Sequence, residues 1–114
     1  MKKIAFVAVA ILLIFVLSGC VAEKAEDVKQ TVDNAELASK KCIELCQQKN
    51  LAGENLSVGP CISNQIIDDW VCDIAHSPRQ DIDNQPENQC ETYGNGTANH
   101  FVELDENCEI IKLR

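Results

Sequence analysis

Cysteine is the residue type with the richest chemistry in this 114-residue chain, which contains seven of them. The first, Cys20, stands apart near the N-terminus. The other six are spread over the rest of the chain: Cys42, Cys46, Cys61, Cys72, Cys90 and Cys108. An even number of cysteines in a small exported domain is typical of a disulfide framework. We therefore expect three disulfides, each stabilising the fold by about 2–4 kcal/mol through restriction of the unfolded chain.

The pairing of these six cysteines is open at the level of sequence, because they can combine in many ways. Proximity along the chain suggests Cys46 with Cys61, Cys90 with Cys108 and, as the remainder, Cys42 with Cys72. Residues 42 and 46 are one turn apart on one face of an expected helix, so both sulfurs can reach the same neighbouring layer. Three residues separate them near a helix end, whereas a thioredoxin-type redox pair is separated by two and begins a helix. We therefore expect structural disulfides.

The sequence contains two candidate sets of metal ligands, one for zinc and one for calcium, and each lacks features that such sites need. Zinc would have to be held by Cys42, Cys46, Cys72 and His76, but the sequence lacks paired Cys-x2-Cys knuckles and an oxidising compartment favours disulfides. Calcium would have to be held by Asp81, Asp83, Asn84 and Glu87, but this run lacks the glycine of calcium loops and Pro86 interrupts it. We expect no metal and no other cofactor.

Catalytic residues are not recognisable in the sequence. His76 and His100 have no serine or cysteine nucleophile in a familiar setting, and neither Gly-x-Ser-x-Gly nor His-Glu-x-x-His occurs. Arg79 is one of few cations among many carboxylates, and we expect it to form a structural ion pair, with ligand binding as the alternative. The prediction is a protein that is not an enzyme.

The N-terminal segment has the layout of an export signal. Lys2 and Lys3 precede an uncharged apolar run over residues 4–17, which is shorter than the roughly 20 residues of a membrane-spanning helix. The run ends in Leu17-Ser18-Gly19-Cys20, which resembles the lipobox of membrane lipoproteins at all four positions. That resemblance implies a signal peptide over residues 1–19 and a thioether-linked diacylglycerol on Cys20, and two acyl chains anchor a protein stably. An ordinary secreted protein and an uncleaved anchor helix are the alternatives.

The net charge of the chain limits the kinds of molecule that it is expected to bind. Removal of residues 1–19 takes two of the 10 basic residues, so that 8 face 18 acidic ones and the mature net charge is about −10. Nucleic acid is excluded as a partner, because phosphate binding needs clustered Lys and Arg. Asn55-Leu56-Ser57 and Asn95-Gly96-Thr97 are glycosylation sequons in expected surface turns, so Asn55 and Asn95 are candidate acceptors.

The elements that position these residues begin with a long helix. Residues 21–50 contain no Gly or Pro and are rich in Ala, Glu, Lys and Gln, which favours one helix. Small and apolar residues recur at heptad spacing and form a weak seam: Val21, Ala25, Val28, Val32, Ala35, Ser39, Cys42 and Cys46. Residues 20–41 are therefore expected to form a helical stalk or linker, with self-association through the seam as the alternative. The end carrying the two cysteines is expected to dock on the domain.

The remaining chain, residues 42–114, is predicted to form one small disulfide-rich α+β domain. We expect short helices over residues 63–69 and 86–93, and strands near residues 70–75, 100–104 and 109–113. The expected sheet is three-stranded and antiparallel. Four runs in this region resemble small uncharacterised cysteine-rich exported proteins of archaea, a resemblance that brings no activity: Asp69-Trp70-Val71-Cys72-Asp73, Pro78-Arg79, Pro86-Glu87-Asn88-Gln89-Cys90 and His100-Phe101-Val102-Glu103.

Together these features predict a non-catalytic surface lipoprotein on the extracytoplasmic side of a cell membrane or envelope. Its anchor is expected to hold a disulfide-rich binding or structural domain at the membrane, with a protein or small-molecule partner that the sequence does not identify. A helix-mediated oligomeric envelope protein and an extracytoplasmic thiol or metal protein are the alternatives.

Overall fold

The computed structural model describes the backbone from Lys2 to Arg114 and the side chains of residues 26–114. The chain divides into two compact units, Met1–Asp33 and Asn34–Arg114. The predicted signal peptide and the predicted lipidation site at Cys20 lie outside the described side chains. Within residues 26–114, no helix is long and apolar enough to cross a membrane.

Helix α1 (Lys2–Leu51) ends in the second unit. The predicted helix is confirmed, and Gly53 ends it with a left-handed backbone (φ 79°). Within Asn34–Arg114, Ala38, Cys42 and Cys46 are completely buried at intervals of four residues, so one stripe of the helix docks on the sheet. Earlier on the same helix, Val28 and Val32 of the predicted seam are 67% and 60% exposed.

The class is α+β, with a four-stranded mixed sheet in the order β1 (Cys61–Ile67), β2 (Trp70–Ile74), β3 (His100–Leu104) and β4 (Ile110–Leu113). The three predicted strands are confirmed, but the prediction of a three-stranded antiparallel sheet is wrong. Strands β2 and β3 pair in parallel, whereas β1 and β4 pair antiparallel with their neighbours. The parallel pair is possible because about two dozen residues cross between β2 and β3, and a parallel connection needs at least a dozen.

Two predicted helices are corrected. Residues 63–69 lie in β1 and the turn after it, because Asp69 adopts a positive φ (70°) and reverses the chain into a hairpin. Residues 86–93 are divided between a 3-10 turn, η3 (Pro86–Asn88), and one turn of helix, α2 (Glu91–Gly94). The disulfide at Cys90 lies between these two pieces.

All six downstream cysteines form disulfides: Cys42–Cys72, Cys46–Cys108 and Cys61–Cys90. The suggested Cys42–Cys72 pair is confirmed, but Cys46–Cys61 and Cys90–Cys108 are wrong. Cys46 belongs to the core between α1 and the sheet, whereas Cys61 packs in a second cluster on the opposite face and meets Cys90 there. Three disulfides indicate an oxidising, extracytoplasmic environment.

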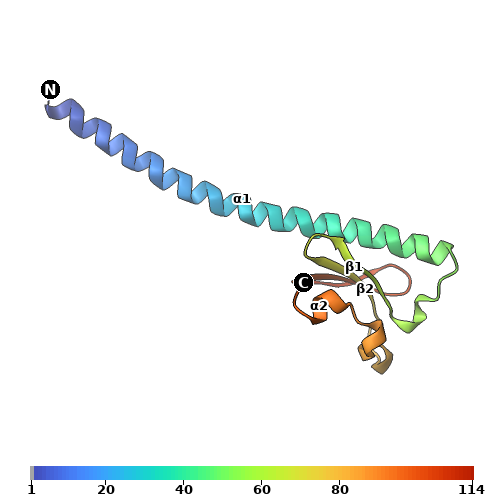
Figure 1. Ribbon diagram of the computed structural model, residues 1–114. Helices are drawn as coiled ribbons and strands as arrows, with labels where there is room; N and C mark the ends of the chain where they lie inside the picture. The colour runs from blue at the N-terminus through green and yellow to red at the C-terminus, as the bar shows by residue number, and fades with distance from the viewer. Residues whose placement is uncertain (1) are drawn as a thin grey trace. The chain divides into compact units, whose positions relative to one another are not determined.

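The two faces of the sheet are covered differently. The end of α1 packs over one face, while the segment that contains the 3-10 turn η2 (Asp81–Asn84), η3 and α2 lies beside the other (Figure 1). The helix-side core is the larger of the two and includes the fully buried side chains of Ile74, Val102 and Leu104. The opposite face has a smaller core of Val71, Cys90 and Ala98.

Candidate functional site

The face of the sheet turned away from α1 carries two rows of side chains. Neighbouring side chains on a strand point to opposite faces, so the odd-numbered residues of β2 and β3 lie together. Strand register places each residue beside its partners in the next strands, and Phe101 and Arg114 exchange backbone hydrogen bonds of 2.9 and 3.1 Å. The two rows across β2, β3 and the end of the chain are Val71–Phe101–Arg114 and Asp73–Glu103–Lys112.

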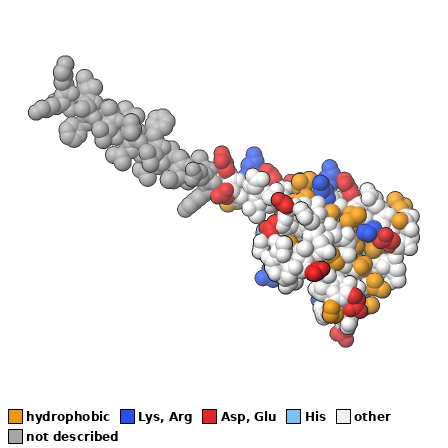
Figure 2. Space-filling view, in the orientation of Figure 1, with side chains coloured by type: hydrophobic (Ala, Val, Ile, Leu, Met, Phe, Trp, Pro, Cys, Tyr) orange, Lys and Arg blue, Asp and Glu red, His pale blue; other side chains and the backbone are white. Residues whose placement is uncertain are grey.

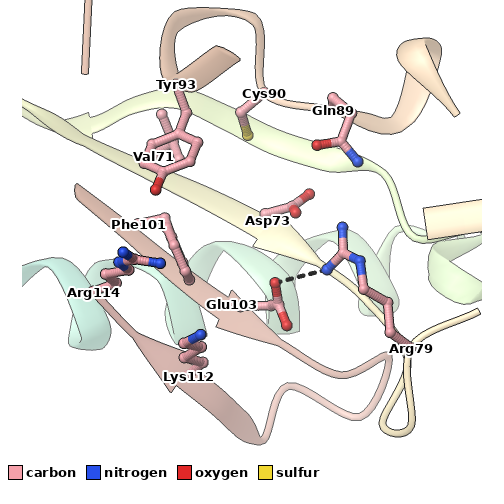
Figure 3. A pocket seen from close by; sticks show the side chains of 10 residues that line it. All are labelled: Val71, Asp73, Arg79, Gln89, Cys90, Tyr93, Phe101, Glu103, Lys112 and Arg114. Carbon is pink, nitrogen blue, oxygen red and sulfur yellow. Dashed lines mark hydrogen bonds and ion pairs between the residues drawn. The ribbon is translucent and has the colours of Figure 1, made fainter. Parts of the chain in front are cut away.

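These rows form the floor of an open pocket of about 350 Å³. Its walls come from the crossing segment between β2 and β3, which contributes Arg79, Gln89, Cys90 and Tyr93 (Figure 3). The Cys61–Cys90 disulfide ties this wall to β1, and the Thr92 hydroxyl donates a hydrogen bond of 2.8 Å to the Asn64 carbonyl. This wall of the pocket is therefore held to β1 by a covalent link and a hydrogen bond.

Basic residues converge on this pocket. Only three Lys or Arg residues follow Lys49 in the sequence, and all three line it: Arg79, Lys112 and Arg114. Acidic side chains, by contrast, are spread over the face of the folded unit drawn in Figure 2. The few basic residues of this part of the chain are thus concentrated at one place, beside the carboxyl groups of Asp73 and Glu103.

Asp73 is the unusual group in the pocket. Its Oδ1 is buried and has no hydrogen-bond partner among the described residues. Burial, followed by repulsion from Glu103, raises the pKa of Asp73 from 3.8 to about 7, although Arg79 acts in the opposite direction. A buried polar atom without a partner is costly in a folded protein, and a carboxyl group with a strongly shifted pKa in a pocket is a candidate for a functional site.

Arg79 fixes one end of the pocket. Its Nη1 donates to Glu103 Oε2 at 3.1 Å, its Nε to Asn84 Oδ1 at 2.9 Å and its Nη2 to the Asp83 carbonyl at 3.3 Å. The predicted ion pair is confirmed. Three of its five N–H groups are used in these bonds, and through them Arg79 positions Glu103 and the crossing loop.

A buried carboxylate organises that loop. Asp83 accepts hydrogen bonds from the backbone N–H groups of His76 (3.0 Å) and Gln80 (2.9 Å) and pairs with His76 Nδ1 at 2.9 Å. Although desolvation raises the pKa of Asp83, these hydrogen bonds outweigh it and hold the pKa below the usual value. Gly59 (φ 71°) packs so closely that a Cβ there would collide with the Asp83 carboxylate. Asp83 therefore acts as an internal clamp.

The apolar side of the pocket consists of aromatic rings. Tyr93 and Phe101 meet edge to face with ring centroids 5.1 Å apart, beside Val71 (Figure 3). This surface adjoins the Arg114 end of the floor. The pocket thus combines an apolar, partly aromatic surface with a few charged groups, which is the usual composition of a small-molecule site.

Other residues singled out from the sequence lie elsewhere. His100 stacks on Trp70 with a ring-centroid distance of 4.6 Å, and it is remote in register from Asp73. Asn55 and Asn95 are exposed, and each accepts a hydrogen bond from the backbone N–H two residues later. In the part of the chain whose side chains are described, no group of three or more His, Cys, Asp or Glu is placed to hold a metal.

Most pocket residues were not predicted from the sequence. Asp73, Tyr93, Phe101 and Glu103 resemble ordinary strand and helix residues until the parallel pairing of β2 with β3 brings them together. The one signal available was the scarcity of cations after Lys49. Comparison with known proteins adds nothing further, because no family model, curated protein or solved structure matches the chain.

Proposed function

We propose that this chain is a lipid-anchored extracytoplasmic protein that binds a small molecule in the pocket between its sheet and the β2–β3 crossing segment, without catalysing a reaction. The observation that carries the proposal is the convergence of Arg79, Lys112 and Arg114, the three basic residues after Lys49, on one pocket. The resemblance of residues 17–20 to a lipobox and the three disulfides support the membrane-anchored, oxidised setting.

Small-molecule binding agrees with the make-up of the pocket better than catalysis does. Lys112 and Arg114 lie beside the ring of Phe101 at one side of the pocket, and the ionisable Asp73 lies at the other end of the row that contains Lys112 (Figure 3). All six downstream cysteines are oxidised, so thiol chemistry has no thiolate available to it. A binding role requires only that the pocket persist, which the Cys61–Cys90 link favours.

The test is a ligand-observed NMR screen of small organic ions against the full oxidised chain, compared with the Lys112→Gln/Arg114→Gln variant. Both residues are exposed, so the variant is expected to fold. Ligands that bind the native chain and lose binding in the variant support the proposal. An identical hit profile for both proteins would refute a function at this pocket. Mass spectrometry of the native N-terminus tests the anchor, with diacylglycerol on Cys20 as the expected result.

A second candidate is an envelope protein that assembles through α1. Its support is the exposure of Val28 and Val32, which occupy the predicted heptad seam. Sedimentation of the chain in detergent, compared with a Val28→Lys/Val32→Lys variant, separates the two. Dimers that dissociate in the variant would favour assembly, and a monomer in both would remove this candidate.

A further inference from the structure

We infer that the pocket takes an amino-carboxylate, a molecule with a carboxylate at one end, a protonated amine at the other and an apolar stretch between them. This inference rests on the proposed function, because it names the class of ligand for the same pocket. Three features of the pocket carry it: two cations without ion-pair partners, a carboxylate with an unpartnered oxygen, and the aromatic surface beside them.

The carboxylate end is assigned to Lys112 and Arg114. Among residues 26–114, the ion pairs within 4 Å involve Lys49, His76, Arg79 and His100, and neither Lys112 nor Arg114 is among them. Figure 3 shows both side chains at the side of the pocket away from Arg79, flanking Phe101. Two cations, one of them a guanidinium, suit a carboxylate, since its two oxygens can accept hydrogen bonds from both.

The amine end is assigned to Asp73 and Glu103. Asp73 Oδ1 needs a donor that the described protein does not supply. Glu103 is neighbour to Asp73 in the sheet, and it shares its charge with only one cation, Arg79. A ligand ammonium group at this point would supply the missing donor and reduce the repulsion between the two carboxyl groups.

The sheet sets the distance between the two ends. Asp73 on β2 and Lys112 on β4 are separated by one intervening strand, so their backbones lie about 10 Å apart, two strand spacings. The side chains lean into the pocket from both ends, and the Val71, Tyr93 and Phe101 surface lies alongside. This spacing suits an extended ligand better than an α-amino acid, whose charged groups are adjacent.

Ligands with a single charge fit this arrangement poorly. A simple anion would satisfy Lys112 and Arg114 but leave Asp73 Oδ1 without a donor. A simple amine would meet Asp73 but leave both cations unpaired. The pocket should therefore bind a ligand with both charges more tightly than a ligand with one. Each end of the first meets a protein group of opposite charge, whereas the second leaves a buried or charged protein group unpaired.

Binding of the amine should depend on pH through Asp73, since only its ionised form attracts an ammonium group. The charged groups that act on Asp73 are Glu103 on β3, Asp83 on η2 and Arg79 on the crossing loop. Lys112 on β4 and Arg114 after it line the same pocket. Because Asp73 has a pKa of about 7, the amine is expected to add most affinity at pH 8 and little at pH 5.5.

The experiment is isothermal titration calorimetry of the full oxidised chain with three probes of equal length: 6-aminohexanoate, hexanoate and hexylamine. At pH 8 we expect 6-aminohexanoate to bind about tenfold more tightly than either single-charged probe, because a charge-assisted hydrogen bond is worth at least that factor. At pH 5.5 its advantage over hexanoate should largely disappear.

Variants assign each end. Asp73→Asn should remove the advantage of 6-aminohexanoate over hexanoate, whereas Lys112→Gln should remove its advantage over hexylamine. Asp68→Asn changes an exposed carboxylate outside the pocket and should leave all three affinities unchanged. If hexanoate or hexylamine binds the native chain as tightly as 6-aminohexanoate, the pocket binds ligands but the inferred class is wrong. If none of the three binds at millimolar concentration, the inferred class is wrong. The ligand screen of the native chain against the Lys112→Gln/Arg114→Gln variant then decides separately whether the pocket binds another class of small molecule.

Discussion

The two faces of the sheet differ in composition and in how completely they are covered. The face under α1 is dry and apolar, and two disulfides, Cys42–Cys72 and Cys46–Cys108, connect it to the helix. The other face carries two rows that contain two carboxylates, two cations and an aromatic ring, and it is closed only in part by the crossing segment. The stability of a small domain with few large side chains is concentrated on the first face.

The difference between the two faces explains how so small a domain can retain Asp73, whose burial is energetically unfavourable. Asp73 and Cys72 are adjacent in sequence, yet one points into the open pocket and the other is completely buried in a disulfide. An unpartnered buried carboxyl oxygen costs a domain roughly 1–3 kcal/mol. A covalently connected core on the opposite face can offset such a cost, which leaves the pocket face free to serve binding.

The largest effect is expected on the helix side. Cys46→Ala/Cys108→Ala removes the disulfide with the longest separation, 62 residues, and should lower the free energy of unfolding by about 4 kcal/mol. Chemical denaturation followed by circular dichroism measures this. Cys61→Ala/Cys90→Ala, with a separation of 29, serves as the comparison on the pocket face and should cost somewhat less while abolishing binding. Equal binding by this second variant would mean that the disulfide does not shape the pocket.

The next effect concerns pH. The pKa of Asp73 is raised in the folded state. Its stabilising contribution to the free energy of unfolding is therefore fully present below pH 4 and is lost as the pH rises through about 7. A rise from 3.8 to about 7 corresponds to about 4 kcal/mol, and partial exposure reduces this to an expected 2–3 kcal/mol. The native chain should therefore unfold more easily at pH 8 than at pH 4.5.

Asp73→Asn is the matched control, since it keeps the size of the side chain and cannot ionise. Its unfolding free energy should change little over the same pH range. Asp83 should not affect this comparison. Because its pKa is lowered in the folded state, its contribution to the free energy of unfolding is lost only below about pH 4, outside the range measured. A variant with the same pH dependence as the native chain would show that Asp73 is not the source.

The clamp of the crossing loop gives a smaller effect. Gly59→Ala places a Cβ against the Asp83 carboxylate and forces a positive φ on a residue that disfavours it, so we expect a loss of about 2 kcal/mol. Gly96→Ala is the control, because it also has a positive φ (81°) but nothing lies within 4 Å of the added Cβ. Thermal melting should place Gly59→Ala clearly below Gly96→Ala, and equal melting points would remove the role given to Asp83.

The smallest expected effect is the difference in stability that two ion pairs of similar length contribute. Arg79→Gln should cost about 1 kcal/mol, because Glu103 is only 15% exposed and Arg79 makes three hydrogen bonds. Lys49→Gln breaks a 3.0 Å pair with the 53% exposed Glu54 and should cost less than about 0.5 kcal/mol. Denaturation curves for the two variants should differ in this order, and the reverse order would mean that Arg79 does not support the pocket.

Sequence reasoning was most successful where the decisive interactions are local. The long helix follows from the composition of residues 21–50, and strands β2, β3 and β4 follow from their alternating side chains and the turns between them. Strand β1 (Cys61–Ile67) takes the place of most of the helix predicted over residues 63–69. It contains two irregularities in its pairing with β2 and no clean alternation of buried and exposed residues, so its pattern carried no strand signal.

The pocket could not be predicted for a different reason. Its rows depend on a parallel pairing between segments about 30 residues apart, and nothing in the sequence near Asp73 or Glu103 specifies that register. Two of the three suggested disulfide pairs are wrong for the same reason, because the face of the sheet that a cysteine occupies decides its partner. Cys46 and Cys61 are close in sequence but belong to opposite faces.

The open face of the sheet holds a carboxyl group, that of Asp73, whose pKa is raised by burial and whose Oδ1 has no hydrogen-bond partner among the described residues. Carbon-13 NMR titration of the Asp73 carboxyl carbon in the full oxidised chain tests it most directly, with Asp68 as an internal reference on the exposed surface. We predict a titration midpoint near pH 7 for Asp73 that moves downward when 6-aminohexanoate is added. A midpoint near pH 4, unchanged by the probe, would contradict the claim.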